Sequence, residues 1–178
     1  LPILWLHDLA EDPESRHLSD SGNRSRFRRL VFVSHWQFTT YHKVLGVPYS
    51  DSIVIRNAIE PIPTHEKSKE GPLRLIYHTT PHRGLDVLLA VYQKLSEKWG
   101  DRVHLDVYSS FNIYGWPQRD EPFEQLFQIC RDHEHITYHG TVSNQEVREA
   151  LQKAHIFAYP STWQETSCIA AIEAMSAG

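Results

Sequence analysis

The feature that most constrains this chain is a regular alternation of short apolar runs with longer segments of helical periodicity. The apolar runs, rich in β-branched and aromatic residues, lie at 3–7, 30–34, 52–56, 73–78, 103–109, 136–139 and 155–160. Helical patterns separate most of them, at 36–45, 84–99, 122–132 and 144–154, and a last helix is expected from about Ser167. Strand–helix–strand alternation predicts an α/β fold with parallel sheets covered by helices on both faces.

The helix starts carry local signals of their own. Ser143 is followed three residues later by Glu146, which is the spacing of a capping box, so a helix is predicted to begin at Asn144. In the segment 84–99 the leucines recur at helical spacing while the charged residues fall on the opposite side, which predicts an amphipathic helix.

One segment interrupts the alternation. Residues 60–72 are polar and proline-rich and show no periodicity, which predicts an interdomain linker at 61–72. Since 1–60 is too short for a complete α/β domain, we interpret it as the C-terminal part of one domain, and 73–178 as most of a second, truncated one. The chain begins inside a strand and ends just after a helix, so we expect a fragment of a longer protein.

Composition excludes several classes of function. Lys and Arg total 18 and Asp and Glu total 22, a net charge of −4, which argues against a general nucleic-acid binder. No apolar run approaches the ~20 residues of a membrane span. Cys130 and Cys168 form no C-x-x-C pair, which favours a reducing, cytoplasmic setting. For the basic segment 23–29 two alternatives stay open: a solvated face, or peripheral contact with an anionic membrane surface or an acceptor.

The most informative stretch is 159–173, where a strand ends, a polar loop follows and a helix begins. From Cys168 onward every residue is apolar or small except Glu173 and Ser176, so we expect a helix buried on all sides. A buried carboxylate without a partner costs several kcal/mol. Glu173 is therefore either paired with a basic side chain or kept as an acceptor for a polar ligand.

A second carboxylate, Glu165, precedes this helix by a few residues. Between the two lie the backbone N–H groups of Thr166, Ser167 and Cys168, which we expect to form a seat for a diphosphate at the helix N-terminus. Carboxylates on either side of such a seat can accept hydrogen bonds from hydroxyl pairs. The layout fits a sugar, a diphosphate and a ribose, placed at the carboxyl end of a strand where open α/β sheets bind ligands.

Glu165 to Glu173 resembles the E-x7-E motif of retaining glycosyltransferases of the GT-B fold, family 4. Five further segments resemble the same family in order: VSHW at 33–36, IRNAI at 55–59, HRGLDVLL at 82–89, YHGTVS with AHIFAYPS at 138–161, and AMSAG at 174–178. The resemblance covers nearly the whole chain. It implies two Rossmann-like domains, of which 1–60 would belong to the acceptor side and 73–178 to the nucleotide-sugar-binding domain.

The resemblance also implies roles for single residues. Glu165 would face the hydroxyls of the donor sugar and Glu173 the ribose, while Arg83 would neutralise the diphosphate as it leaves. His7 matches the histidine that the family places near the donor sugar. The implied reaction moves a sugar from a nucleoside-diphosphate sugar to a glycan, lipid or protein acceptor with retention of configuration, without a metal or other cofactor. The chain departs from the family at Tyr77, followed by His78, where many members carry a second basic residue.

Other readings of the same residues stay open. A non-catalytic nucleotide-sugar-binding module and a sugar-nucleotide epimerase on the same fold are the alternatives. A dinucleotide oxidoreductase is disfavoured because no G-x-G-x-x-G is present. His133, His135 and His139 lack the spacing of a complete zinc site, so we expect no metal there.

Overall fold

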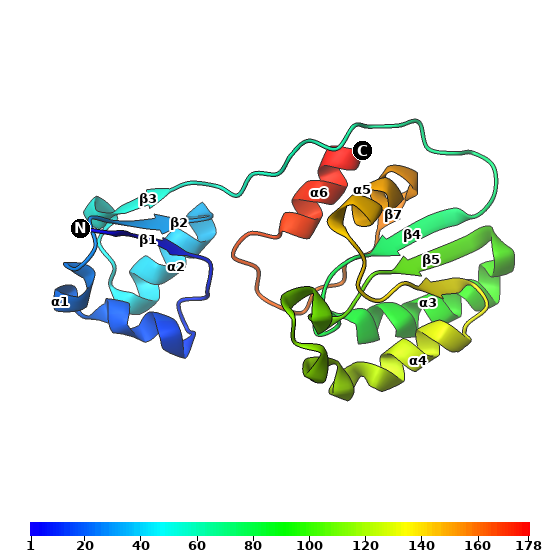
Figure 1. Cartoon of the computed structure of the whole chain (residues 1–178), viewed down its shortest axis with the longest axis horizontal. Helices are drawn as coiled ribbons and strands as arrows, with labels where there is room; N and C mark the ends of the chain where they lie inside the picture. Colours follow the sequence, from blue (N-terminus) through cyan, green and yellow to red (C-terminus); the bar gives the residue numbers. More distant parts are fainter. The chain divides into compact units, whose positions relative to one another are not determined.

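The computed structural model describes residues 1–178 and has an α/β architecture with two separate parallel sheets (Figure 1), which confirms the predicted fold class. The chain forms two compact units. Unit 1 consists of Leu1–Ile59 and Gln164–Ile169, and unit 2 consists of Glu60–Trp163 and Ala170–Gly178.

Unit 1 holds a three-stranded parallel sheet in the order β1 (Ile3–Leu6), β2 (Arg29–Phe32), β3 (Ser52–Val54). One face packs on α2 (His35–Leu45), and a 3-10 helix (Pro13–Ser19), α1 (Ser21–Arg24) and a 3-10 turn (Tyr49–Asp51) complete the unit. Helix α2 begins where the Ser34 side chain accepts the N–H of Gln37. The buried Gln37 amide in turn donates to the carbonyl oxygens of Leu6 and Asp8, at 3.2 and 2.9 Å, and so secures the carboxyl end of β1.

The opposite face of the unit 1 sheet is less covered than the sequence predicts. Leu4 and Leu6 point into the core with α2, so the alternate residues Ile3 and Trp5 point away from it, and their exposed fractions are 61% and 55%. Ile53 and Ile55 are likewise exposed. The expectation of helices on both faces is therefore wrong for this sheet within unit 1, since no helix of that unit packs on this side.

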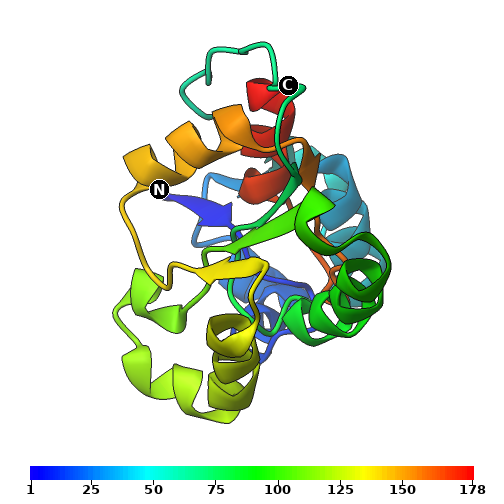
Figure 2. The ribbon, with the colours of Figure 1, turned by 90° about the vertical axis from the view of Figure 1, so that its right-hand side faces the viewer.

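Unit 2 holds a four-stranded parallel sheet in the order β6 (Ile136–Tyr138), β5 (Val103–Val107), β4 (Leu73–Tyr77), β7 (Ile156–Phe157). Helices α3 (Leu85–Trp99) and α4 (Glu124–Asp132) cover one face, and α5 (Asn144–Lys153) and α6 (Ile169–Ala177) lie on the other (Figure 2). Short 3-10 helices span Gly100–Arg102, Phe111–Tyr114 and Pro117–Phe123. The predicted capping box at Ser143 and Glu146 is confirmed at the start of α5.

The strand alternation explains why both faces of this sheet are apolar near its centre. Leu75 and Tyr77 of β4 join the core beneath α3 and α4, whereas Ile76 between them joins a second core with Leu151 and Ala177 of α5 and α6. Two layers of helices are thus held by residues one position apart on a single central strand.

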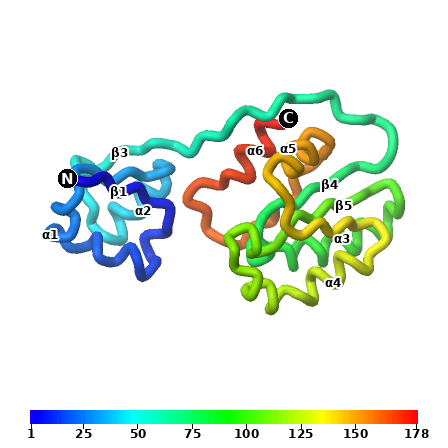
Figure 3. Tube along the Cα trace, in the orientation of Figure 1, coloured from blue at the N-terminus to red at the C-terminus, as the bar shows by residue number.

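Residues 60–72 contain no helix or strand, and they are bound along the surface of unit 2 (Figure 3). Ile62 is 3% exposed in the core with Ile76 and Leu151. The Arg148 guanidinium donates to the carbonyl oxygens of Glu60 and Pro61, each at 2.9 Å. We call this segment the strap, because hydrogen bonds and the buried Ile62 fix it to unit 2 at several points.

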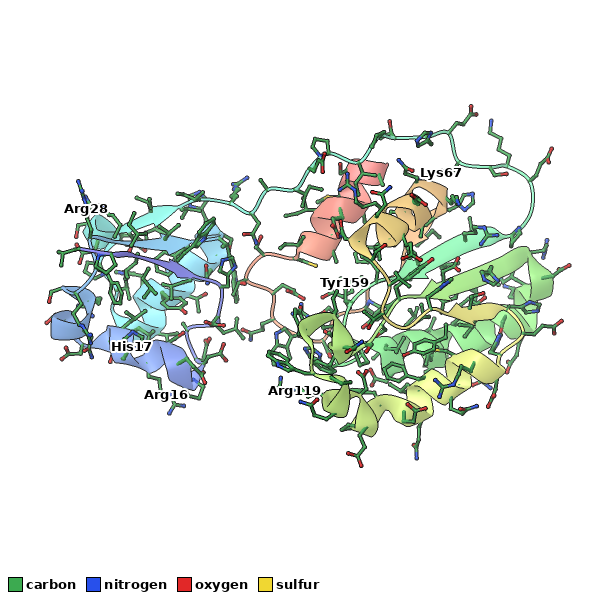
Figure 4. The ribbon with its side chains drawn as sticks, viewed as in Figure 1. Arg16, His17, Arg28, Lys67, Arg119 and Tyr159 are labelled. Carbon is green, nitrogen blue, oxygen red and sulfur yellow. The ribbon has the colours of Figure 1, made fainter.

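Lys67 is the strongest anchor of the strap (Figure 4). Its ammonium donates to the carbonyl oxygens of Leu151 and Gln152 near the end of α5, at 3.0 and 3.1 Å, and to that of Ala177 at the end of α6, at 3.2 Å. Carbonyl groups at a helix C-terminus lack intrahelical partners and carry partial negative charge, so one cation stabilises two helix ends.

Helix α6 differs from its prediction in two respects. It begins at Ile169 rather than near Ser167, and it is not buried on all sides: Met175 is 75% and Ile169 is 45% exposed. Only Glu173 and Ala177 of this helix are buried. The helix is apolar all round, but the rest of unit 2 covers only one of its sides. None of the helices is both long enough and apolar enough to cross a membrane.

Candidate functional site

Buried polar atoms without partners gather just beyond the carboxyl ends of β4 and β5. The hydroxyls of Thr80 and Ser109, which are 4% and 2% exposed, make no hydrogen bond. The same holds for Nδ1 of His82 and for both ring nitrogens of His78. An unsatisfied buried polar group costs about 1–3 kcal/mol, and native proteins contain few of them. A cluster of them at the edge where α/β sheets bind ligands indicates a site for a polar ligand.

Glu173 lies at this site and is 9% exposed, which confirms the predicted buried carboxylate. Its Oε1 accepts a hydrogen bond from the Asn144 side chain at 3.1 Å. Its Oε2 lies 3.7 Å from Nε2 of His78, which is an ion-pair distance when the imidazole is protonated and is too long for a hydrogen bond. The carboxylate, carried by α6, is thus held by residues of α5 and of the carboxyl end of β4, and its close partners include no Arg or Lys.

The electrostatics of Glu173 keep it ionised at neutral pH. The His78 ring lowers the pKa of the Glu173 carboxyl, burial raises it, and the Asn144 amide and the charge of Arg148 lower it further. The net result is a pKa below the ordinary value of 4.5. An ionised carboxylate only accepts hydrogen bonds, so Glu173 is suited to ligand groups that donate them, such as hydroxyls.

The loop that follows β4 brings a cation to the same edge. Arg83 Nη1 lies 3.5 Å from the hydroxyl of Tyr159, which follows β7. The Tyr77 hydroxyl, at the end of β4, fixes this loop by donating to the carbonyl of Thr80 at 2.9 Å. Burial raises the pKa of Tyr77. At Gly84, with φ +94°, the loop meets the backbone of Pro160 so closely that no side chain fits between them.

Aromatic rings form a rim beside these groups. The His82 ring stacks on Phe111, with centroids 5.1 Å apart, and meets the edge of Trp163 at 5.0 Å. Burial, followed by the charges of Arg83 and Arg119, lowers the pKa of His82, so this ring is neutral at physiological pH. Phe111 is buried, whereas Tyr114 and Trp116 of the same loop are exposed at 56% and 44%.

Of the predicted residues, His7 and the segment around Glu165 come together in unit 1. The Thr166 hydroxyl donates to the backbone carbonyl of His7 at 2.8 Å. The His7 side chain is exposed and its ring lies 5.6 Å from that of Trp5, while Glu165 is half-buried. The helix starts only at Ile169, so Thr166, Ser167 and Cys168 precede it. The expectation that their backbone N–H groups lie in the first turn of this helix is therefore wrong.

Two residues of the site were missed by the sequence argument, His78 and Asn144. His78 is the first residue after β4, and a polar residue at that position of a central parallel strand is a usable signal. Asn144 was assigned only to a helix start; its amide reaches Glu173 because α5 and α6 lie on the same face of the sheet. Nothing in the spacing from Asn144 to Glu173 indicates that contact.

Some of the other residues that the sequence singles out have partners within the protein. His133 bonds to the Ser96 hydroxyl at 3.0 Å and its ring meets that of Tyr92. No group of three or more His, Cys, Asp or Glu side chains is arranged to hold a metal ion. Cys130 is buried, and burial raises the pKa of its thiol to about 12. In the basic segment, Arg24 is held by the carbonyls of Leu18 and Ser19, while Arg26, Arg28 and Arg29 are exposed, and membrane contact stays a prediction.

Known structures resemble this chain over almost its whole length. A glycosyltransferase from Rickettsia africae ESF-5 has a TM-score of 0.70 at 13% identity and covers 98% of this chain and 48% of its own. WaaG, a glycosyltransferase involved in lipopolysaccharide biosynthesis, has a TM-score of 0.65 at 15% identity, covering 99% and 54%. A point mutant of TarM from S. aureus, in a complex that includes UDP, has a TM-score of 0.66 at 14% identity, covering 98% and 34%. The chain thus spans between a third and about half of these structures.

A search of curated protein sequences finds no significant match. The family model described as glycosyl transferases group 1, in contrast, matches residues 62–178, which is well over half of the chain and includes the whole candidate site of unit 2. Together with the parallel α/β sheets and the structural neighbours, this match shows that the chain belongs to the group 1 glycosyltransferases and has the GT-B fold.

Proposed function

We propose that this chain forms the donor-binding part of a glycosyltransferase that moves a sugar from a nucleoside-diphosphate sugar to an acceptor with retention of configuration. Family membership supports sugar transfer as such. The proposal for the donor is carried by one observation: an ionised, 9%-exposed Glu173 stands among unsatisfied polar groups at the carboxyl edge of the sheet. Metal-dependent chemistry has no part in the proposal.

Glu173 is assigned to the ribose of the donor. A carboxylate can accept two hydrogen bonds at once from neighbouring hydroxyls, and the 2′- and 3′-hydroxyls of a ribose supply such a pair. Asn144 occupies only one lone pair of Oε1, at 3.1 Å, so acceptor capacity remains. The same two oxygens have nothing to offer an anionic group, so the diphosphate must lie elsewhere along the edge.

The diphosphate is assigned to the loop after β4. Arg83 supplies a planar guanidinium that can donate two parallel hydrogen bonds to phosphate oxygens. The unsatisfied hydroxyls of Thr80 and Ser109 supply further donors on the same edge. When the bond between the anomeric carbon and the phosphate oxygen breaks, negative charge grows on the departing nucleoside diphosphate. Donors placed in advance stabilise that charge, which usually contributes most to catalysis.

Glu165 and His7 remain the proposed catalytic residues, on the resemblance described above. The Thr166–His7 hydrogen bond supports this pairing because it holds the segment that carries Glu165 beside His7 within unit 1. Glu165 would contact hydroxyls of the donor sugar, with the backbone groups of Thr166, Ser167 and Cys168 next to it. Transfer then depends chiefly on positioning of the sugar and stabilisation of the leaving group.

The test is isothermal titration calorimetry of the 178-residue chain with UDP, GDP and ADP. At least one is expected to bind, and Glu173→Ala should weaken it about 10- to 100-fold, since hydrogen bonds to a charged group are worth ~1.5–3 kcal/mol. Glu149→Ala, which removes an exposed carboxylate from the neighbouring helix α5, is the matched control and should bind as the unchanged chain does.

The ribose assignment has a sharper check. The 2′-deoxy form of the bound diphosphate should bind the unchanged chain more weakly than the ribo form, and the two forms should bind Glu173→Ala equally. Equal sensitivity to the missing hydroxyl in both proteins would contradict the role of Glu173. Absence of binding by all three diphosphates would overturn the proposed function, and binding without consumption of any donor by the longer protein would favour a binding module.

A further inference from the structure

His78 has an environment that the proposed roles of Glu173 and Arg83 do not explain. Its side chain is 3% exposed, and neither ring nitrogen makes a hydrogen bond. The one charged group near the ring is the Glu173 carboxylate, whose Oε2 lies 3.7 Å from Nε2, so Nε2 has at most an ion-pair contact and Nδ1 has no partner. Such an arrangement is costly in the free protein and indicates that a partner for the ring arrives from outside.

The groups that face the pair of His78 and Glu173 come from three elements. Helix α6 contributes the Glu173 carboxylate, 3.7 Å from Nε2 of His78. Helix α5 contributes the uncharged Asn144 amide and the charge of Arg148, both of which act on Glu173. Strand β7 contributes the Phe157 ring, whose centroid lies 4.8 Å from that of His78 and which carries no charge. The nearest charge to His78 is therefore negative.

The position of His78 in the chain places it at the edge assigned to the diphosphate. It follows Tyr77, the last residue of β4, and precedes the loop that carries Thr80 and Arg83. A diphosphate bound to that loop brings at least two negative charges to the carboxyl end of β4. The imidazole is then placed between two anions, the Glu173 carboxylate and the ligand, and both are acceptors only.

We propose that His78 takes up a proton when a nucleoside diphosphate binds, so that donor binding is coupled to pH. The inference rests on the proposed function and adds a regulatory property to the same site. The proton comes from the solvent and its buffer, and no bond is formed or broken elsewhere in the protein. The imidazolium has two donors, one for each anion, which satisfies both ring nitrogens that are unpaired in the free chain. Histidine suits this task because its charge changes within the physiological range of pH.

The experiment measures proton uptake by calorimetry of the chain with UDP, or with GDP or ADP if one of these binds more tightly. Titrations at the same pH in buffers with different ionisation enthalpies give the number of protons taken up on binding. Since the terminal phosphate of the ligand itself titrates near pH ~6, the readout is the difference between the unchanged chain and His78→Gln at about pH 7.5–8.5. A difference approaching one proton is expected, together with an affinity that falls up to about tenfold per pH unit in the unchanged chain but not in His78→Gln.

Two further variants complete the design. His139→Gln removes a histidine of unit 2 that bonds to Asp106 at 2.9 Å, away from Glu173, and should leave the proton uptake unchanged. His78→Arg carries a fixed charge and should bind the diphosphate without proton uptake and with little dependence on pH. The proton uptake measured with His78→Arg tests the proposal even if His78→Gln does not fold.

The outcomes separate the two proposals. If a diphosphate binds but the proton uptake is absent, or is the same in His78→Gln and His78→Arg as in the unchanged chain, the role of His78 is overturned while the proposed function stands. If no diphosphate binds at any pH, both are overturned. Loss of the uptake in both His78 variants and its retention in His139→Gln supports the proposal.

Discussion

Gly84 provides the most direct test of how the loops at the candidate site are built. A Cβ at this position would lie 2.9 Å from the carbonyl carbon of Pro160 and closer still to its oxygen. Both neighbours are backbone atoms, which cannot swing aside as the end of a flexible side chain does. The residue also has φ +94°, in the left-handed region that glycine adopts without strain.

The cost of Gly84→Ala is the sum of two effects. An alanine in the left-handed region costs about 1–2 kcal/mol, of which ~0.4–1 kcal/mol is returned because the unfolded chain has fewer conformations. The collision with Pro160 forces the loops apart, and overpacking of this kind costs about 1–3 kcal/mol. We therefore expect the free energy of unfolding to fall by about 1–5 kcal/mol.

Gly115→Ala is the matched control, since Gly115 has φ +74° and no atom lies within 4 Å of the place that an alanine methyl would take. It retains only the backbone effect, so it should cost about 1 kcal/mol or less. Urea denaturation followed by far-UV circular dichroism measures both variants. Equal losses of stability in the two variants would refute the close approach of the loops that follow β4 and β7.

Two further predictions concern stability. Lys67→Met should lower the free energy of unfolding by about 1 kcal/mol, because the last carbonyls of α5 and α6 lose their shared cation. Lys69→Met, on the exposed part of the strap, should change little in the same urea assay. Equal effects of the two substitutions would contradict the anchoring role of Lys67. The pKa of Glu173 lies below its ordinary value of 4.5 in the folded protein, so its ionisation adds stability above that pH and the gain is lost as the pH falls through the folded pKa. Glu173→Gln should therefore show less loss of stability between about pH 5 and 3 in thermal unfolding, and an unchanged acid profile would contradict the shift.

The sequence predicted the elements of the fold because local signals and tertiary packing agree at most of them. All seven apolar runs are strands, but the predicted runs overshoot the carboxyl ends: 73–78 ends at Tyr77, 103–109 at Val107 and 155–160 at Phe157. The extra residues are those at which the chain turns out of the sheet. The 3-10 helices at Pro13–Ser19 and Pro117–Phe123 were missed, since neither has apolar periodicity.

The candidate site was predictable only in part, for a related reason. Glu173 could be predicted because a single acidic residue in an otherwise apolar helix can be recognised from the sequence of that helix alone. His78 and Asn144 could not, because their contacts with Glu173 depend on how three separate elements pack on one sheet. The hydrogen bond from Thr166 to His7 could not be predicted either, because it joins residues far apart in the sequence.

Unit 1 is assembled from two stretches of chain, Leu1–Ile59 and the short piece Gln164–Ile169. Synthesis runs from the N-terminus, at about 5–20 residues per second, so the second piece leaves the ribosome more than a hundred residues after the first is complete. During that interval the carbonyl of His7 cannot accept the hydrogen bond from Thr166, which has not yet been synthesised. The segment that carries Glu165 therefore joins unit 1 only after most of unit 2 has emerged.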